Sequence, residues 1–464
     1  MSVDLAVVGA GPAGLSAATL GAELGLAVVL FDEQGVPGGQ IYRASETTPA
    51  RDVLGPDFAR GDALVAAFRA SGARYVPRAS VWNVDAQGAV DFTLDGRAER
   101  TEARRVLIAT GAIERPMPIP GWTLPGVMTA GAAQIALKTA GLRPNGRVVL
   151  AGTGPLLWLL ARQLLAAGTR IEALLDTTPD ANWPDALPHL PEFLVSPLLF
   201  KGLALQTAVR RRVRVVGGVE AIEALGEARL RRVLFRRALH GDEELAADLL
   251  LLHQGAVPNV HLAMAAGVVH DWDARRLAFA PRLDPWGASS LERVAVAGDG
   301  GGIGGARAAE EQGRLAALDA AFRLGRIDAV ERERRAHLIR VALSRALRGR
   351  AFIDILHRPA IGFRVPRGKT VLCRCEEVTA DDVAGAVALG VPGPNQLKAF
   401  LRAGMGPCQG RQCALTATET IAAALGKSPG DIGHMRVRPP IKPLTLGAFA
   451  SLPIDDDARR AVER

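Results

Sequence analysis

Four cysteines near the C-terminal end of this 464-residue chain are the residues whose type and spacing most clearly permit chemistry. Cys373 and Cys375 form a CxC pair, Cys408 and Cys413 form a CxxxxC pair, and the chain has no other cysteine. A disulfide-stapled secreted protein would spread its cysteines over the fold, whereas residues 1–372 hold none. Because thiolates bind zinc and iron–sulfur clusters, we predict a metal site at these residues.

The presence of four cysteines is compatible with either a zinc ion or an iron–sulfur cluster. Structural zinc sites usually pair two CxxC motifs, which this chain lacks. The segments around the cysteines, Cys373-Arg-Cys-Glu-Glu-Val378 and Gly404-Met-Gly-Pro-Cys-Gln-Gly-Arg-Gln-Cys413, closely resemble the [2Fe–2S] domain of bacterioferritin-associated ferredoxins. The resemblance implies that Cys373, Cys375, Cys408 and Cys413 bind a [2Fe–2S] cluster in a small helical domain.

A second site is indicated by the glycines of Gly9-Ala-Gly11-Pro-Ala-Gly14. They lie between a predicted buried strand at 4–8 and a predicted helix at 12–25. Gly9 permits the tight turn, Gly11 lets a pyrophosphate approach the backbone at the helix N-terminus, and Gly14 permits close helix–strand packing. Asp32 ends the next predicted strand, at 26–31, where a carboxylate can accept hydrogen bonds from a ribose. The pattern predicts a dinucleotide-binding fold.

Further segments resemble the two-dinucleotide-domain flavoproteins, the superfamily of glutathione and thioredoxin reductases. These are Ala109-Thr110-Gly111 and Gly298-Asp299 at predicted strand ends, and Pro37-Gly-Gly39-Gln40, which is similar to a flavin-proximal loop. The resemblance implies FAD, and it implies contacts from Gly9, Gly11, Gly14, Asp32, Gln40, Thr110, Gly111 and Asp299. With no cysteine before Cys373, the redox dithiol of a disulfide reductase is absent, so that activity is excluded.

A second nucleotide motif departs from the usual pattern. Gly152-Thr-Gly154-Pro-Leu-Leu157 precedes a predicted helix at 155–167, but Leu157 stands where glycine or alanine permits close packing. Asp176 lies at the ribose position, and no arginine beside it could receive a 2′-phosphate. NAD(P) binding is therefore doubtful, and a vestigial or purely structural fold is the favoured interpretation.

The order of motifs predicts an α/β protein with two Rossmann-like dinucleotide-binding domains, the second inserted in the first, and a small helical [2Fe–2S] domain. We predict the following boundaries: residues 1–115 and 275–328 for the FAD-binding domain, 116–274 for the second dinucleotide-binding domain, 329–368 for a helical connector, 369–430 for the [2Fe–2S] domain, and 431–464 for an extended C-terminal tail.

Composition excludes several partners. The net charge is +8, but the densest basic run, at 210–214, has no interleaved aromatic residues, so nucleic-acid binding is not expected. The N-terminus enters a strand without a signal peptide, and the most apolar helical run, at 155–167, is too short to span a bilayer. We expect no membrane span and a cytoplasmic location.

Over its whole length the sequence resembles the A subunits of octopine and nopaline oxidases, the B subunit of hydrogen cyanide synthase, and the flavin–iron-sulfur subunit of hydroxyproline dehydrogenases. The resemblance implies an electron-transfer subunit of a dye-linked dehydrogenase that oxidises a C–N bond in an amino acid or opine. It also implies a partner flavoprotein subunit of the D-amino-acid-oxidase type that oxidises the substrate, a quinone or ferredoxin-like electron acceptor, and FMN as a candidate cofactor between the subunits.

We predict no catalytic acid or base in this chain, because His253, His261 and His357 are isolated in the sequence and are expected to be core or surface histidines. Two alternative functions stay open. One is a self-contained NAD(P)H-dependent reductase that passes electrons through the cluster. The other is a non-enzymatic docking protein that carries a cluster on a degenerate flavoprotein fold.

Overall fold

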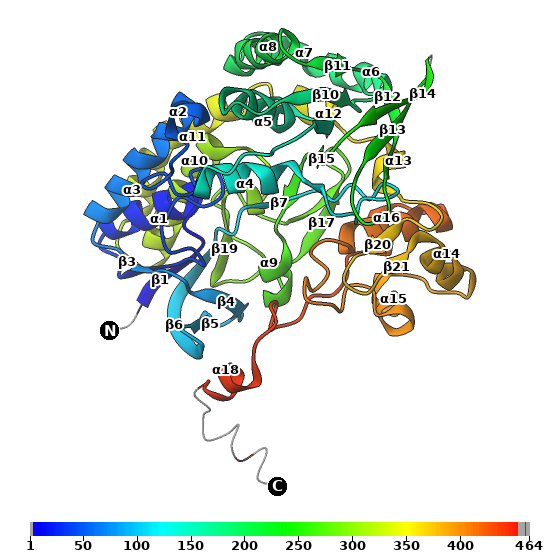
Figure 1. Ribbon diagram of the computed structural model, residues 1–464. Coiled ribbons are helices and arrows are strands. Elements are labelled where there is room, and N and C mark those ends of the chain that lie inside the picture. The colour runs from blue at the N-terminus through cyan, green and yellow to red at the C-terminus, as the bar shows by residue number, and fades with distance from the viewer. Residues whose placement is uncertain (1–2, 239, 453–459, 461–464) are drawn as a thin grey trace.

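The N-terminal glycine motif joins the first strand and helix of a largely parallel sheet. The structure, a computed structural model, describes residues 3–238, 240–452 and 460. The strand order is β3-β2-β1-β6-β5-β4, with β19 also paired to β6 (Figure 1). The strands of this sheet are β1 (Val3–Val8), β2 (Val28–Phe31), β3 (Arg74–Val76), β4 (Ser80–Val84), β5 (Ala89–Leu94), β6 (Arg97–Ile108) and β19 (Val294–Val296).

The long strand β6 belongs to two kinds of pairing. Its C-terminal half pairs in parallel with β1 and β19, and its N-terminal half pairs antiparallel with β5. β1 and β2 are almost continuous buried apolar runs, as expected for parallel strands that are covered on both faces. Three helices flank this sheet: α1 (Pro12–Glu23), α3 (Arg60–Ala70) and α10 (Ala306–Arg323).

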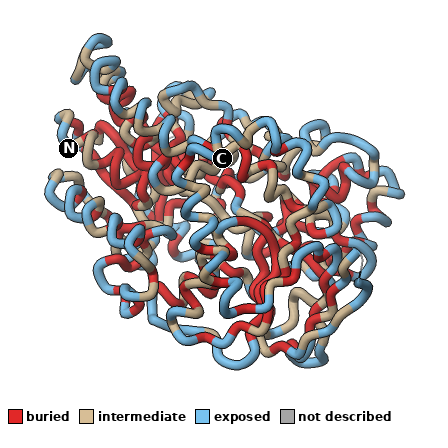
Figure 2. The backbone as a smooth tube through the Cα atoms, turned by 90° about the horizontal axis from the view of Figure 1, so that it is seen from above, coloured by how far each residue is buried: buried red, intermediate tan, exposed pale blue. Residues whose placement is uncertain are grey.

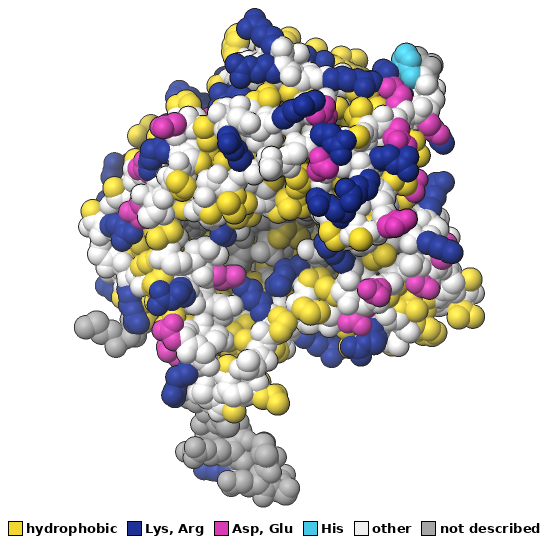
Figure 3. All heavy atoms as spheres, in the orientation of Figure 1, with side chains coloured by type: hydrophobic (Ala, Val, Ile, Leu, Met, Phe, Trp, Pro, Cys, Tyr) yellow, Lys and Arg dark blue, Asp and Glu magenta, His cyan; other side chains and the backbone are white. Residues whose placement is uncertain are grey.

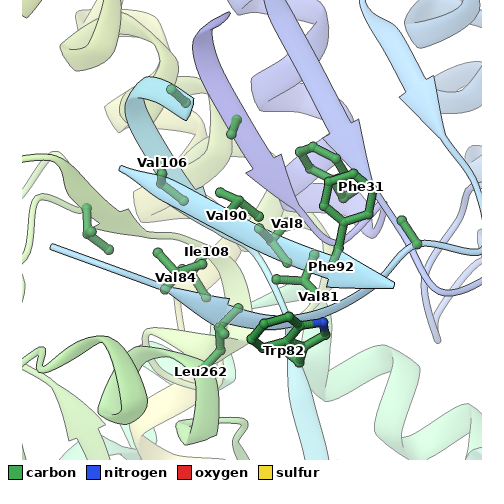
Figure 4. Packing of buried hydrophobic residues seen from close by; sticks show 14 of the residues in the cluster. Val8, Phe31, Val81, Trp82, Val84, Val90, Phe92, Val106, Ile108 and Leu262 are labelled. Carbon is green, nitrogen blue, oxygen red and sulfur yellow. The ribbon is translucent and has the colours of Figure 1, made fainter. Parts of the chain in front are cut away.

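The core of the first fold lies between the parallel strands and the antiparallel β4–β6 ribbon (Figure 4). The ring centroids of Phe31 and Phe92 are 4.8 Å apart, and Trp82 and Leu262 extend the same cluster. On the other face α1 packs closely on α10, because a side chain at Gly313 would place its Cβ 2.1 Å from the carbonyl oxygen of Ala13. Buried backbone is concentrated in the interior, with exposed loops around it (Figure 2).

A second parallel sheet is formed by strands that lie in the chain between β6 and β19, which is the predicted insertion of one fold in the other. Its strand order is β11-β10-β9-β15-β8. The strands are β8 (Val127–Thr129), β9 (Val148–Thr153), β10 (Ile171–Asp176), β11 (Arg214–Val216) and β15 (Leu249–Gln254). The helices of this region are α4 (Ala130–Ala140), α5 (Pro155–Ala166), α6 (Trp183–Ala186), α7 (Leu190–Leu194) and α8 (Pro197–Arg210).

Smaller elements connect and cover these sheets. An antiparallel sheet is made of β12 (Val219–Leu225), β13 (Arg232–Arg237) and β14 (Gly241–Ala246). Two-stranded pairs are β7 (Ala112–Glu114) with β16 (Ala256–Pro258), and β17 (His270–Asp273) with β18 (Ala278–Pro281). The remaining short helices are α2 (Arg51–Leu54), α9 (His261–Ala266), and the 3-10 helices η1 (Pro56–Ala59), η2 (Asp180–Asn182), η3 (Leu187–His189) and η4 (Gly298–Gly300).

The C-terminal part forms the predicted helical module, beside β17 in Figure 1. It follows the connector helices α11 (Ala329–Leu347), α12 (Arg350–Leu356) and α13 (Ile361–Arg364). The module contains the paired strands β20 (Val371–Cys373) and β21 (Val378–Thr379), and the helices α14 (Ala380–Ala388), α15 (Pro394–Leu401), α16 (Ala414–Leu425) and α17 (Pro429–Ile432).

The tail is extended over much of its described length and lies against the first fold, where the backbone N–H of Ile441 donates to the carbonyl of Trp82 at 3.0 Å. It also contains a short helix that was not predicted, α18 (Leu446–Ala450), whose N-terminus is capped by the hydroxyl of Thr445. Residues 453–459 and 461–464 of the predicted tail lie outside the described residues.

Within the described chain no single helix is both long and apolar enough to cross a membrane. Two consecutive helical segments, Asp180–Leu194 and Pro197–Arg210, are together long and apolar enough, but the chain bends by 106° between them.

Candidate cofactor sites

The first glycine motif has the geometry that its spacing predicts. Gly9 has a φ of +107°, and a Cβ there would lie 2.5 Å from the carbonyl oxygen of Ala109. A Cβ at Gly14 would lie 1.9 Å from the carbonyl oxygen of Gly9. Gly11 is the N-cap residue of α1, and a Cβ there would meet only Gly39, at 3.9 Å. Gly9 and Gly14 are thus required by the protein's own packing, while Gly11 leaves room beside the helix N-terminus.

Asp32 lies at the end of β2, next to this motif. Its carboxylate accepts hydrogen bonds from the backbone N–H groups of Ala10 at 2.6 Å and Gln34 at 2.7 Å. Burial raises the pKa of Asp32, and these two hydrogen bonds oppose the shift. The carboxylate is therefore held in place at the sheet edge where the ribose of a dinucleotide is expected.

The predicted flavin-proximal loop packs directly on the glycine motif. The N–H of Gly38 donates to the carbonyl of Ala10 at 2.8 Å. The buried ammonium of Lys138 donates to the carbonyl oxygens of Gln40 and Ile41, both at 3.0 Å. The side chain of Gln40 is exposed and accepts from Arg43. The structure thus brings the loop backbone to the site and leaves the Gln40 side chain on the surface.

Two further loops predicted to contact FAD lie together. Asp299 accepts from the N–H groups of Gly304 and Gly305 at 2.8 and 2.9 Å, and so fixes the N-terminus of α10. A Cβ at Gly300 would lie 3.3 Å from the carbonyl oxygen of Gly111. The loop at Thr110 and Gly111 therefore adjoins the Asp299 loop. Figure 3 shows a hollow near the centre of this face, over the region where Figure 1 draws β7 and α9.

The second glycine motif is covered by the connector. The ring Nδ1 of His357, directly after α12, lies 2.9 Å from the hydroxyl of Thr153 and 3.3 Å from that of Thr178. Asp176, at the predicted ribose position, accepts from the backbone and the hydroxyl of Thr178 at 3.0 and 2.6 Å. Leu157, which stands where the motif usually has glycine or alanine, is fully buried in the core of this fold. One carboxylate oxygen of Asp176, at the expected ribose position, is thus bonded within the protein.

His253 is a core histidine, as expected, and both His253 and His357 have hydrogen-bond partners that the sequence did not indicate. His253 is 2% exposed, and its Nδ1 lies 2.5 Å from Glu114. Glu114 also accepts from the N–H of Gly131 at 2.9 Å. Sequence reasoning missed Glu114, because the two side chains come from strands 139 residues apart. Desolvation lowers the pKa of His357 to about 4.

The four cysteines are brought together by the C-terminal module. Cys413 lies in contact with both Cys373 and Cys408, and Cys408 lies in contact with Cys375. All four are free thiols; Cys373 and Cys413 are buried, and Cys375 is exposed. Among the described residues, no three histidine, cysteine or acidic side chains form the compact ligand set of a single metal ion.

Contacts among the thiols shift their pKa values in opposite directions, and burial raises the pKa of Cys375. Hydrogen bonding from Cys413 lowers the pKa of Cys373 to about 6 and that of Cys408 to about 5, while the same contacts raise the pKa of Cys413. The N–H of Gly404 points at the sulfur of Cys373, 3.5 Å away. A Cβ at Gly406 would lie 2.3 Å from the Cβ of Cys375, so glycine is required there. Thiolates and backbone donors together suit a cationic metal centre.

One short segment connects the two sites. Asn259 donates its N–H to the carbonyl of Gly111 at 3.0 Å and accepts from the hydroxyl of Thr110 at 3.4 Å. Two residues later, His261 is 3% exposed, and burial lowers its pKa to about 3, while the backbone of Gln409 opposes the shift. Gln409 follows Cys408 directly. The segment 259–261 thus lies between the Thr110–Gly111 loop and the cysteine loop.

Two models of known protein families match the chain, one over the nucleotide folds and one over the cysteine module. A family model described as pyridine nucleotide-disulphide oxidoreductase matches residues 3–313, and a model described as the sarcosine oxidase A3 domain matches residues 367–452. The A subunit of opine oxidase from Agrobacterium tumefaciens (strain Ach5) is 46% identical over 99% of this chain and 93% of its own length. The chain belongs to the family of opine oxidase A subunits. It is therefore an FAD-dependent oxidoreductase of the pyridine nucleotide-disulphide oxidoreductase type.

A further relative and a solved structure match over most of this chain. The HcnB subunit of hydrogen cyanide synthase from Pseudomonas aeruginosa is 34% identical over 97% of this chain and 99% of its own length. The crystal structure of L-proline dehydrogenase from P. horikoshii has a TM-score of 0.71, 19% identity, and covers 97% of this chain and 79% of that chain. The predicted resemblance to the opine oxidase and hydrogen cyanide synthase subunits is confirmed, and the α/β fold with Rossmann-like domains is confirmed too.

Proposed function

We propose that this chain is the FAD- and [2Fe–2S]-containing electron-transfer subunit of a multi-subunit dye-linked dehydrogenase. The complex would oxidise a C–N bond of an amino acid or opine on a partner flavoprotein subunit of the D-amino-acid-oxidase type. Relatives named as subunits of opine oxidase and hydrogen cyanide synthase support a multi-subunit assembly. A quinone or a ferredoxin-like protein is the proposed acceptor, and FMN between the subunits stays a prediction.

The observation that carries the proposal is the segment from Asn259 to His261. It is bonded to the Thr110–Gly111 loop at one end and lies beside the cysteine loop at Gln409 at the other. FAD accepts two electrons as a hydride, and a [2Fe–2S] cluster passes electrons singly, so the two groups together convert one mode of transfer to the other. A continuous packed segment between the two sites is what such a transfer requires.

The residues at the first site would hold and orient FAD. Gly11 at the N-terminus of α1 leaves space and helix-end N–H groups for the pyrophosphate. Asp32 would accept from the adenosine ribose, and Asp299 holds the N-terminus of α10 near the expected pyrimidine end of the flavin. A helix N-terminus stabilises negative charge there. Gly9, Gly14, Thr110 and Gly111 shape the surrounding loops.

We favour a two-iron cluster over zinc because the CxC and CxxxxC spacing resembles that of a [2Fe–2S] domain and lacks the paired CxxC motifs usual for structural zinc. The four thiols lie close enough to interact with one another. The lowered pKa values of Cys373 and Cys408 favour the thiolates that any such centre needs. Cys373, Cys375, Cys408 and Cys413 are the proposed ligands.

The connector argues against the NAD(P)H-dependent reductase. His357 bonds to Thr153 beside the second glycine motif and also lies 3.3 Å from Thr178, which donates twice to one carboxylate oxygen of Asp176. We expect NADH or NADPH alone to leave the flavin oxidised in anaerobic stopped-flow absorbance, with dithionite as the positive control. Rapid bleaching by either nucleotide would favour the reductase.

The proposal is tested by removing one ligand from the purified complex. In the wild type, anaerobic addition of substrate should bleach the flavin and produce the electron paramagnetic resonance signal of a reduced [2Fe–2S] centre, with two irons per chain by elemental analysis. Cys375→Ser, at the exposed thiol, should lose most of the iron and the signal while it keeps FAD. Electron delivery to a one-electron acceptor should fall at least tenfold.

Met405→Leu provides the matched control, because it changes another exposed sulfur of the same loop. It should keep the iron, the signal and the transfer rate. Zinc in place of iron in the wild type, or a centre that stays oxidised beside fully reduced flavin, would refute the proposed function.

A further inference from the structure

A pocket of about 200 Å³ lies between the second nucleotide fold and the connector. We call it the connector pocket and define it by Thr153, Gly154, His253, Gln254, Arg350 and His357, which are among the residues that line it. It lies at the N-terminus of α5, a helix of 12 residues, and Ile303 borders it from the loop that follows Asp299. The proposed electron-transfer function assigns it no role.

Arginine side chains dominate the charged lining of the pocket. Four arginines line the pocket, Arg115, Arg276, Arg350 and Arg358, against a single lining carboxylate, Asp354. Asp354 is shared by Arg350 at 2.6 Å and Arg276 at 3.2 Å. Arg276 also pairs with Asp273 at 3.1 Å, and Arg358 pairs with Asp185 at 3.2 Å. The guanidinium donors left for an anion are therefore Nη1 of Arg115 and Nε of Arg350, which make no hydrogen bond.

Buried polar atoms in the lining lack hydrogen-bond partners in the described structure. Arg115 is 4% exposed, and its Nη1 makes no hydrogen bond; the nearest carboxylate, Glu419, is 3.7 Å away. Gln254 is 1% exposed, and its Oε1 is also without a partner. Buried donors and acceptors rarely stay unpaired, since each costs about 1–3 kcal/mol. A ligand that accepts from Arg115 would remove one such deficit.

The shape of the pocket limits the size of the ligand. Gly154 and the N-terminus of α5 lie on one side, and His253, held by Glu114, lies near Gly154. On the other side, His357 is bonded to Thr153 and closes the way toward Asp176. An extended dinucleotide would need that closed space for its adenosine. A compact ligand would not.

We propose that the connector pocket binds a small organic oxyanion, either a carboxylate or a phosphate, and not a dinucleotide. The oxyanion is held by Arg115, Arg350 and the N-terminus of α5, with Gln254 accepting from any N–H or O–H group of the ligand. This proposal does not depend on the electron-transfer function and can fail or succeed separately.

Isothermal titration calorimetry on the FAD-loaded protein tests the proposal, since bound FAD fills the first nucleotide site. The probes are inorganic phosphate, succinate and NAD⁺. We expect saturable binding of one ion per chain for phosphate or succinate, and whichever binds more tightly identifies the oxyanion class. NAD⁺ should bind at least tenfold more weakly than that probe.

Leu156→Glu is the decisive variant, and Leu156→Gln is its matched control. Leu156 lines the pocket in the first turn of α5, where a carboxylate suits the helix N-terminus and leaves the fold intact. The Glu variant should weaken binding at least tenfold by charge repulsion, and the neutral Gln variant should remain within threefold of the wild type. Arg350→Gln should weaken binding at least fivefold and provides an independent check.

The proposal would be overturned if neither phosphate nor succinate bound saturably to the wild type. It would also be overturned if binding were unchanged in both Leu156→Glu and Arg350→Gln. A third contrary result would be that NAD⁺ binds most tightly of the probes and loses affinity in Leu156→Glu.

Discussion

At the scale of single residues, two glycines of the first motif serve different purposes. Gly14 has no space for a side chain, because its Cβ would lie 1.9 Å from the carbonyl oxygen of Gly9. Gly11 has space within the protein, since the nearest atom to its Cβ would be 3.9 Å away. Gly14 is therefore needed by the fold, and Gly11 by the proposed pyrophosphate.

These differences predict opposite outcomes for two alanine substitutions. Gly14→Ala should lower the free energy of unfolding by about 1–3 kcal/mol through overpacking, and it should lose FAD. Gly11→Ala should unfold at nearly the wild-type temperature without cofactor but retain less than a tenth of the FAD. Thermal unfolding of the cofactor-free proteins and the ratio of flavin to protein absorbance measure the two effects.

Gly385→Ala supplies the control, because Gly385 lies inside α14 with nothing within 4 Å of its Cβ position. Alanine is the better helix former by about 1 kcal/mol, so this variant should keep FAD and be slightly more stable. Equal loss of stability in Gly11→Ala and Gly14→Ala would contradict the distinction.

At the scale of elements, the connector is more than a link between domains. α11 packs on the first fold, where the Arg332 guanidinium lies 4.0 Å from the ring centroid of Phe322 in α10 and 4.3 Å from that of Trp286. α12 and His357 then cover the second glycine motif, and Asn182 donates to the carbonyl oxygens of Leu356 and Arg358. The connector fixes both folds in one arrangement.

His357 gives this contact a pH dependence. Its pKa is lowered by desolvation to about 4, whereas an unfolded histidine has a pKa of about 6.5. Between these values the unfolded chain binds a proton that the folded chain does not, so the stability present above pH 6.5 is lost as the pH falls toward 4. The loss attributable to His357 should reach at most about 3 kcal/mol.

Chemical denaturation between pH 4 and 7.5 measures this loss. His357→Gln, which can still hydrogen-bond to Thr153, should flatten the acid side of the stability profile. His337→Gln is the control, because His337 is exposed on α11, and it should leave the profile unchanged. The explanation fails if the two variants have the same profile.

At the scale of the whole molecule, a buried ionic cluster holds the cysteine module against the nucleotide folds. Glu419 in α16 is 3% exposed and pairs with Arg364, and Arg115 lies 3.7 Å from its other oxygen. Burial lowers the pKa of Arg115 and of Arg364 to about 10. The tryptophan N–H of Trp122 adds a hydrogen bond to the carbonyl of Val371 at 2.8 Å.

Removing the charge of Glu419 should loosen this docking. Glu419→Gln leaves two buried guanidinium groups without a carboxylate, a change that typically costs about 3–5 kcal/mol. We expect that loss in denaturant unfolding, together with faster proteolysis of residues 361–452 under native conditions. Asp271→Asn breaks the exposed pair with Arg282 and should leave the free energy of unfolding nearly unchanged, because exposed ion pairs are screened by solvent. A similar small cost for Glu419→Gln would argue against this role.

Features whose residues are contiguous can be predicted from the sequence alone. The glycine turns, the first strand–helix–strand unit and the clustering of the four cysteines follow from local spacing, because turns and helices are formed by neighbouring residues. Local patterns predict no element between residues 32 and 104, where the structure includes α3 and β3–β5. Short strands such as β4 and β5 depend on packing against distant partners, which local propensity does not encode.

Contacts between distant segments can be seen only in the tertiary structure. His253 meets Glu114 across 139 residues, Thr110 meets Asn259 across 149, and His357 meets Thr153 across 204. Each of these residues is isolated in the sequence, and no periodic pattern around it indicates which residue it contacts. Their pairing arises from the register of parallel strands and the path of the connector. The covered second motif and the segment between the two candidate cofactor sites therefore exist only in the folded chain.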